Sequence, residues 1–317
     1  MLLFVFLIIH KPFILILEHV QWIVTYIKFK KTPILYNLKM DPRKIKEKII
    51  MDLSDQIPEL AIRENDFVLN RLTSKKNMVF ELIFEKKPEN FPKIVILKLF
   101  RTDYAQIEYD ALIKLEKQGL TVPKVVFFKK PYIILERING KNLTNFINDN
   151  LINISSLHDL KLQTRKQLTR SIKRLAKWLA ILHKNNVVSK TNNEIIVFNK
   201  GDTRLRDFVY DPSKHVMYGV DFEESYEGNH LDDLAWVCCS LLDTTPGIFE
   251  TPEPVHKIKL IKVFLKKYYK VNHDFAFSFE YFAERLIEDL NIVIERRDLD
   301  FGQVRKNAIL GNILKGF

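Results

Sequence analysis

Two periodicities of apolar residues divide the chain into an extended part and a helical part. Between residues 66 and 100, apolar and polar residues alternate, with turn residues near 74–77 and 88–92. This alternation is typical of half-buried strands, so three strands are expected here. The stretch 103–119 instead has helical spacing and ends at a glycine, and two further strands are expected in "TVPKVVFFKKPYIILERING". The first half is therefore expected to be an antiparallel sheet with one inserted helix.

After Gly140 the pattern becomes mainly helical, with one extended region in between. Helices are expected at about 142–150, 158–184, 231–242, 255–271 and 276–297. Residues 194–225 predict a strand, a charged loop, two strands joined by a turn, and a second acidic position at Asp221. A β-rich unit at 40–138 followed by a helical unit at 139–317 predicts an α+β protein of two lobes with a cleft between them.

The first 39 residues are strongly apolar. A membrane helix needs about 20 predominantly apolar residues, but Lys11, Pro12 and Glu18 interrupt this run. A charge is costly in hydrocarbon, and proline interrupts a helix. Two hypotheses stay open for residues 1–39: a membrane-associating segment, or a start codon assigned too early, with the protein beginning at Met40. We prefer the second, because an amphipathic helix with isoleucines on one face is expected directly after Met40.

Composition narrows the classes of protein. The 317 residues are 47% hydrophobic and 28% charged, which indicates a globular protein with a substantial core. The net charge of +11 favours anionic partners such as nucleotides, nucleic acid or an acidic membrane surface, without choosing among them. Because the basic residues look scattered among acidic ones, dedicated nucleic-acid binding is not expected. The adjacent Cys238 and Cys239 fit neither a metal site nor an unstrained disulfide. We expect both to be reduced and buried, as in a cytoplasmic protein.

Charged residues occur at places where phosphoryl transfer would need them. This chemistry uses a cation for the nucleotide phosphates, carboxylates for Mg²⁺, and a carboxylate that orients the attacking hydroxyl. Lys98 lies in the apolar strand "IVILKLF", Asp202 and Asp207 lie in "KGDTRLRDF", and Asp221 lies in "GVDFEES". Each residue alone has an ordinary explanation, since lysines occupy strand surfaces and aspartates form turns. Their order along the chain makes the joint interpretation worth pursuing.

Residues 66–245 resemble the protein-kinase-like superfamily, and its aminoglycoside phosphotransferase and choline kinase branch more than protein kinases. The resemblance rests on "IVILKLF", "IEYDALIKLEKQGLTVPKVV", "YIILERINGKNL", "KGDTRLRDF", "GVDFEES" and "HLDDLAW". It implies a two-lobed α+β fold with a small antiparallel sheet and one helix in the N-lobe and a larger helical C-lobe. It also implies an enzyme that uses ATP and Mg²⁺ to transfer the γ-phosphate to a hydroxyl of a small molecule.

The resemblance implies a role for each matched residue. Lys98 would bind the phosphates with Glu108 as its ion-pair partner, and the backbone from Glu136 to Ile138 would contact the adenine. Asp202 would accept the proton, and Asp207 and Asp221 would bind Mg²⁺. Asp233 would support the catalytic loop. Arg204 would lie near the γ-phosphate, where it would offset the charge of the carboxylates.

The chain departs from the family pattern at several points. The glycine-rich loop is replaced by "TSKKN", which leaves Ser74 and Asn77 as candidate phosphate contacts. Asp207 stands where the family has a metal-binding asparagine, although a carboxylate is also a hard ligand for Mg²⁺. The gap between His183 and Asp202 is longer than in many relatives. We therefore expect His183 to be structural and an extra strand to lead into the loop.

The acceptor is expected to be a small molecule, because only ten residues separate Asp221 from Leu231. A peptide-docking activation segment would need more chain. The alternatives that stay open are a serine/threonine protein kinase, a nucleotide-binding pseudokinase and, if residues 1–39 are translated, a membrane-associated lipid or sugar-lipid kinase. The expected location is the cytoplasm, or the membrane surface if residues 1–39 anchor the chain.

Overall fold

The computed structural model describes residues 42–56, 63, 66–74, 76–154, 156–191, 194–245, 247–250 and 254–300. The two hypotheses for residues 1–39 concern a segment that lies outside these described residues. Within the described part, no helix combines the length and the apolar character that crossing a bilayer would require.

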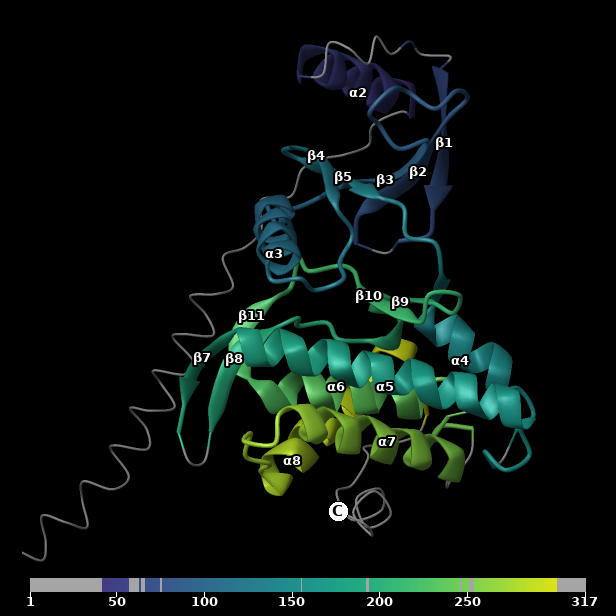
Figure 1. Ribbon diagram of the computed structural model, residues 1–317, viewed down its shortest axis with the longest axis vertical. Helices are drawn as coiled ribbons and strands as arrows, with labels where there is room; N and C mark the ends of the chain where they lie inside the picture. Colours follow the sequence, from purple (N-terminus) through teal and green to yellow (C-terminus); the bar gives the residue numbers. More distant parts are fainter. Residues whose placement is uncertain are drawn as a thin grey trace, which may run out of the picture.

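The upper lobe in Figure 1 is built on a five-stranded antiparallel sheet. Its strands are β1 (Phe67–Leu72), β2 (Met78–Phe84), β3 (Ile94–Leu99), β4 (Val125–Lys129) and β5 (Tyr132–Glu136), in the order β1-β2-β3-β5-β4. Every second side chain of β2 is buried, as the alternating sequence predicts. Helix α2 (Pro42–Gln56) packs Ile45 and Ile49 into the same core as this sheet. The helix predicted after Met40 and the three strands that follow it are therefore present.

Helix α3 (Ala105–Lys117) lies beside the sheet but belongs to the larger core of the molecule. Its buried residues Ala111, Leu112 and Leu115 join a cluster that extends through the helical lobe. The helix also places Glu108 inside the protein, with only 1% of the residue exposed. A buried glutamate on this helix indicates a specific partner, since charged side chains are almost never fully buried alone.

The lower lobe consists mainly of helices (Figure 1). They are α4 (Leu143–Leu151), α5 (Leu162–Asn185), α6 (His230–Asp243), α7 (Val255–Val271) and α8 (Phe279–Arg297). Their bounds agree with the predicted ones to within a few residues. Helix α5 begins four residues later than expected, because Ser156 and Asp159 close a hydrogen-bonded turn in front of it. The side chains of Asn142, Asn229 and Ser278 cap α4, α6 and α8.

Two three-stranded sheets lie between the large sheet and the helices (Figure 1). One has the order β10-β9-β6, from Val216–Gly219, Phe208–Asp211 and Lys141–Asn142. The other has the order β11-β8-β7, from Tyr226–Asn229, Ile195–Asn199 and Val187–Lys190. The charged loop runs from β8 to β9 and so connects the two sheets. The expected turn at 211–214 is the β9–β10 hairpin, whereas strands β6, β7 and β11 were not expected.

Candidate active site

Asp233 holds the charged loop in place from below. It lies in the first turn of α6 and is fully buried. Its Oδ2 accepts a hydrogen bond from the backbone N–H of Lys200 (2.8 Å) and lies 3.0 Å from Nε2 of His183. Its Oδ1 accepts from the N–H of Gly201 (3.1 Å) and from the hydroxyl of Thr203. One carboxylate thus fixes the backbone just before Asp202 and the side chain just after it.

Lys200 links this loop to the segment that carries Asp221. Its buried ammonium group donates to the carbonyl oxygens of Asp202 (3.2 Å) and Asp221 (2.9 Å). Asp221 has a left-handed backbone, with φ of 65°, which is uncommon for a residue with a side chain. The two carbonyl contacts on one lysine explain how two acidic segments far apart in sequence are held side by side. Lys200 therefore has a geometric role in the loop.

The side chain of Asp202 is surrounded by arginines. Its Oδ2 is paired with Arg204 and lies 3.7 Å from Nη2 of Arg206. Its Oδ1 is buried and has no hydrogen-bond partner. Burial lowers the pKa of Arg204 to about 10, and the positive charge of Arg206 acts in the same direction. Asp202 is therefore held in one orientation with one oxygen available.

Asp207 is buried at the end of the same loop. Its Oδ1 lies 3.8 Å from Nε of Arg206, and its Oδ2 has no hydrogen-bond partner. Its backbone carbonyl accepts from the N–H of Val220 (3.0 Å), so it lies beside the residue that precedes Asp221. Burial raises the pKa of Asp207, and the negative charge of Asp221 adds to this effect against the opposing charge of Lys200. A bound cation would offset the cost of burying the ionised carboxylate of Asp207.

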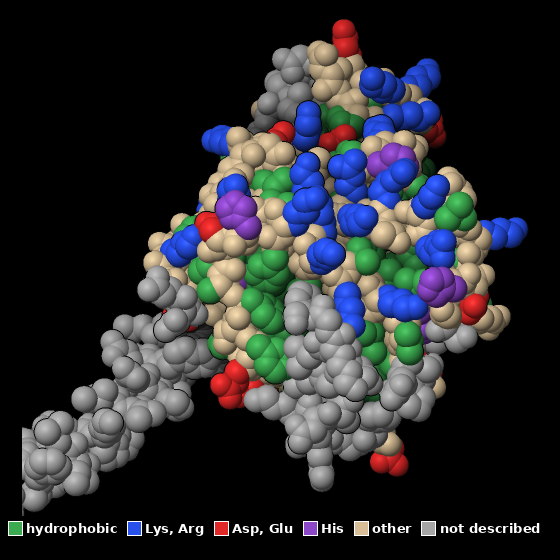
Figure 2. Space-filling model, turned by 60° about the horizontal axis from the view of Figure 1, so that its bottom comes forward, with side chains coloured by type: hydrophobic (Ala, Val, Ile, Leu, Met, Phe, Trp, Pro, Cys, Tyr) green, Lys and Arg blue, Asp and Glu red, His purple; other side chains and the backbone are tan. Residues whose placement is uncertain are grey.

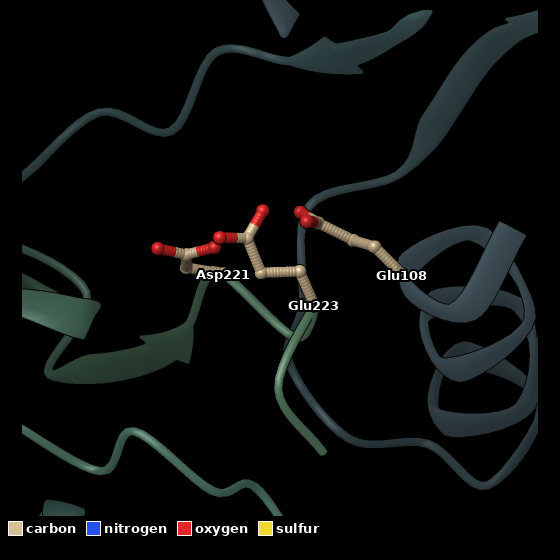
Figure 3. Close-up of side chains that lie close together, drawn as sticks. All are labelled: Glu108, Asp221 and Glu223. Atoms are coloured by element: carbon tan, nitrogen blue, oxygen red, sulfur yellow. The ribbon is translucent and has the colours of Figure 1, made fainter. Parts of the chain in front are cut away.

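Lys98 on β3 lies at the centre of three carboxylates. Its Nζ is 2.5 Å from Oε2 of Glu108, 2.5 Å from Oδ1 of Asp221 and 3.2 Å from Oε2 of Glu223. Figure 3 shows these carboxylates turned toward one another, with Glu108 coming from a helix and the other two from one extended segment. The predicted pair of Lys98 and Glu108 is thus present as an ion pair, and Asp221 joins it.

The charges of this cluster shift one another's pKa values. Burial raises the pKa of Glu108 to about 7, although the ammonium group of Lys98 opposes the rise. Burial also acts to raise the pKa of Asp221, but Lys98 and Lys200 outweigh it and hold that pKa at about 2. Burial would lower the pKa of Lys98, yet the three carboxylates raise it above its ordinary value. Lys98 is therefore charged, and Asp221 is ionised at neutral pH.

The turn between β1 and β2 folds onto the segment that follows Asp221. The side-chain amide of Asn77 donates to Oε2 of Glu223 (2.5 Å), and its oxygen accepts from the N–H of Arg101 (3.3 Å). Ser74 is exposed and accepts a hydrogen bond from the N–H of Asn77 (3.4 Å). In this arrangement Ser74 and Asn77 shape the turn. Their predicted contact with phosphate remains a prediction.

From the sequence, Glu223 and Glu224 could be contacts for a cationic acceptor or part of a solvated loop; in the structure both pair with lysines of the protein. Glu223 is buried against Lys98, and Glu224 receives the ammonium group of Lys76 at 2.5 Å. Lys76 also lies 4.0 Å from Oδ2 of Asp202. The only signal in the sequence was the run of acids after Asp221, which is equally typical of a solvated loop.

The predicted adenine-binding residues lie where the large sheet ends. Glu136 is the last residue of β5, pairs with Val95 of β3, and donates its N–H to the carbonyl of Lys124 (2.9 Å). Ile138 lies two residues further on, in the segment that leads to β6 and the lower lobe. Both residues are therefore on the connection between the lobes, and their contact with a nucleotide remains a prediction.

The residues present fit a divalent cation at one place and not at another. The oxygens of Glu108, Asp221 and Glu223 lie within 4.8 Å of one another, but the ammonium group of Lys98 already balances part of their charge. Asp207 and Asp221 are the better candidates for cation ligands. Asp207 offers a buried oxygen without a partner, and the Asp221 side chain is 43% exposed. Two carboxylate oxygens are hard ligands suited to Mg²⁺.

These features define a two-lobed fold of the protein-kinase-like type. No family model matches the chain, and no curated protein matches it in sequence. Among solved structures, the choline kinase LicA from Streptococcus pneumoniae aligns with 85% of this chain and 98% of its own, with 14% identity and a TM-score of 0.50. At this identity the likeness concerns the fold. The predicted resemblance to this branch of the superfamily is confirmed at that level.

Two other solved structures are similar to the chain. The gentamicin–APH(2")-IIa complex aligns with 86% of this chain and 99% of its own, with 15% identity and a TM-score of 0.47. An ethanolamine kinase from Plasmodium vivax aligns with 88% and 90%, with 13% identity and a TM-score of 0.45.

Proposed function

We propose that the protein is an ATP- and Mg²⁺-dependent phosphotransferase that moves the γ-phosphate to a hydroxyl of a small molecule. The observation that carries this proposal is the convergence of Lys98, Asp202, Asp207 and Asp221 from separate segments. Lys98 contacts Asp221 directly, and Lys200 bonds the carbonyls of Asp221 and Asp202. Phosphoryl transfer relies on positioning and electrostatics, so a fixed arrangement of such charges is its main requirement.

Asp202 is the proposed catalytic carboxylate. Its unpartnered Oδ1 would accept a hydrogen bond from the acceptor hydroxyl. It would take up the hydroxyl proton as the acceptor oxygen bonds the γ-phosphorus and the bond from that phosphorus to the bridging oxygen breaks, releasing ADP. Arg204 holds the other oxygen of Asp202, which keeps the carboxylate oriented. Through Lys200 and Gly201, Asp233 fixes the backbone of this residue.

The nucleotide side of the reaction would use the remaining residues. Asp207 and Asp221 would hold Mg²⁺, which when bound neutralises the phosphate oxygens and keeps the phosphates aligned. Lys98 would bind the phosphates while Glu108 holds its side chain in place. When a nucleotide binds, the ammonium group of Lys98 would contact both the phosphates and some of the carboxylates that it contacts here.

A small acceptor is favoured by the segment after Asp221. Residues 226–229 form β11, paired along its length with β8, and α6 begins at His230. This leaves no stretch of free chain there on which a peptide could dock. The choline kinase of similar fold is named for a small hydroxyl compound, which agrees with this class. We propose no individual acceptor.

The test is transfer from γ-labelled ATP to a panel of small hydroxyl compounds and proteins. Asp202→Ala should abolish labelling, whereas Asp149→Ala, at an exposed acid on α4, should leave it unchanged. Asp207→Asn should retain transfer but need more Mg²⁺, because the amide keeps an oxygen and loses a charge. Binding of Mg²⁺-ATP, read as a thermal shift, without any Asp202-dependent transfer would instead support a pseudokinase.

A further inference from the structure

The whole excess of positive charge lies on two helices. Helices α5 and α7 together carry 13 basic residues and no acidic residue. The chain has 50 Lys and Arg and 39 Asp and Glu, so the rest of the chain has 37 basic and 39 acidic residues. The expectation that basic residues are scattered was wrong. It came from counting along the sequence, where acidic segments separate the two helices.

The two helices lie side by side and run in the same direction. Near their C-terminal ends, Nδ1 of His183 is 2.7 Å from the hydroxyl of Tyr268, and Asn272, directly after α7, donates to the carbonyl of Ala180 (3.0 Å). Their apolar faces are buried in the core of the lower lobe. Apart from the buried Lys257, the basic side chains are fully or partly exposed. Figure 2 shows Lys and Arg side chains gathered across the face that these helices form.

We call this surface the α5–α7 face. It consists of Arg165, Lys166, Arg170, Lys173, Arg174, Lys177 and Lys184 of α5 and Lys259, Lys262, Lys266, Lys267 and Lys270 of α7. Like charges this close repel one another, and neither helix has a carboxylate to offset the repulsion. Two of the arginines contact imidazoles, with Arg165 3.3 Å from His158 and Arg170 2.7 Å from His215. An anionic partner would reduce the repulsion between the basic side chains of this face.

The chemistry of the face favours anionic lipid over nucleic acid. The aromatic side chains of Trp178, Phe264 and Tyr268 are buried. The half-buried ring of Tyr269 packs edge-on against His230 and Phe277, so it is not presented for stacking on bases. Nine of the twelve basic residues are lysines, which act as point charges on flexible stems and suit a fluid layer of headgroups. Leu162 and Val255, at the starts of the helices, are 56% and 45% exposed. Exposed apolar side chains beside lysines are typical of membrane-surface helices.

We propose that the α5–α7 face is a docking surface for an anionic phospholipid bilayer. The two helices carry none of the residues proposed to bind the nucleotide, Mg²⁺ or the acceptor. Docking through them leaves the residues of the proposed active site free. The proposal does not depend on residues 1–39, and it does not depend on the proposed activity.

The test is sedimentation of the full-length chain with lipid vesicles. We expect binding to phosphatidylcholine vesicles that contain phosphatidylserine and little binding to phosphatidylcholine alone. The variant changes six lysines of the face to glutamine: Lys166, Lys173, Lys177, Lys259, Lys266 and Lys270. Because each basic residue near such a surface contributes on the order of 1 kcal/mol, partition should fall more than about 100-fold. Raising the salt from about 0.15 M to 0.5 M should weaken wild-type binding strongly.

A matched variant controls for the change in net charge. It changes six exposed lysines outside the α5–α7 face to glutamine: Lys44, Lys86, Lys87, Lys93, Lys117 and Lys124. Both variants lose six charges, so a smaller effect of the control assigns binding to the face. Circular dichroism and thermal unfolding establish that both variants are folded. The proposal is overturned if neutral vesicles bind equally well, if the two variants behave alike, or if duplex DNA or RNA binds more tightly than the anionic vesicles.

Discussion

Replacing Lys98 with methionine should leave the carboxylates around it without their counter-charge. Glu108 and Glu223 are only 1% and 5% exposed, and both contact Nζ of Lys98. Removing one partner from a buried ion pair costs about 3–5 kcal/mol, because the remaining charge is neither solvated nor paired. The Asp221 side chain is 43% exposed, so it contributes less than the two buried glutamates. We therefore expect Lys98→Met to lower the free energy of unfolding by about 3–5 kcal/mol at pH 8.

The loss should depend on pH in a defined direction. The pKa of Glu108 is about 7 in the folded protein and ordinarily 4.5, so folding raises it. Between these values the folded protein binds the proton more tightly, and stability falls as pH rises through this window. Below pH 4.5 the carboxyl is neutral in both states, and its contribution to the penalty disappears. The difference in the free energy of unfolding between wild type and Lys98→Met should therefore be smaller at pH 4 than at pH 8.

Urea unfolding followed by circular dichroism at both pH values measures this prediction. Lys93→Met is the control, because Lys93 is exposed, and its free energy of unfolding should change by less than about 0.5 kcal/mol. Adding Glu108→Gln to Lys98→Met removes one of the uncompensated charges and should recover part of the loss. A decrease below about 1 kcal/mol at pH 8, or a loss that is equal at the two pH values, would refute the argument from buried charge.

Three further outcomes follow from the loop and its support. Asp233→Asn should lower stability by about 2–4 kcal/mol and the phosphotransfer rate at least about 100-fold, because the amide cannot accept every hydrogen bond that the carboxylate accepts; urea unfolding and initial rates measure the two effects, and a variant as active as the wild type would contradict it. Gly201→Ala should cost about 1–3 kcal/mol in urea unfolding, since φ is +91° and the added Cβ would overlap the carbonyl oxygen of Glu224; unchanged stability would show that the backbone relaxes. Burial raises the pKa of Cys238 and of Cys239, so iodoacetamide at pH 8 should modify neither thiol until the protein is unfolded, as mass spectrometry would reveal.

The fold and the main acidic residues of the site were predictable because they follow local patterns. Alternation of apolar residues marks the strands, and the order of the charged motifs places Lys98, Asp202 and Asp221 on the chain. Lys98, Glu108 and Asp221 do meet, as the resemblance implied. These features depend on residues close in sequence or on a motif order that the superfamily shares.

Contacts between distant segments were not predictable. Asn77 donates a hydrogen bond to Glu223, which lies 146 residues away in the sequence, and Lys76 donates one to Glu224, which lies 148 residues away. No local pattern marks such partners, because each side chain alone looks like part of a polar turn. The concentration of charge on the α5–α7 face was missed for the same reason, since it arises only when the two helices pack together.

Strand β11 has a consequence for how such an enzyme is controlled. Many protein kinases are switched by a segment after the metal-binding aspartate that becomes ordered when it is phosphorylated. Here that position is taken by residues 226–229, whose backbone is already held by β8, and α6 begins at once. An order–disorder switch has no chain to act on in this segment. Modification of residues 226–229 would therefore have to break existing strand pairing, and could not act by ordering a free segment.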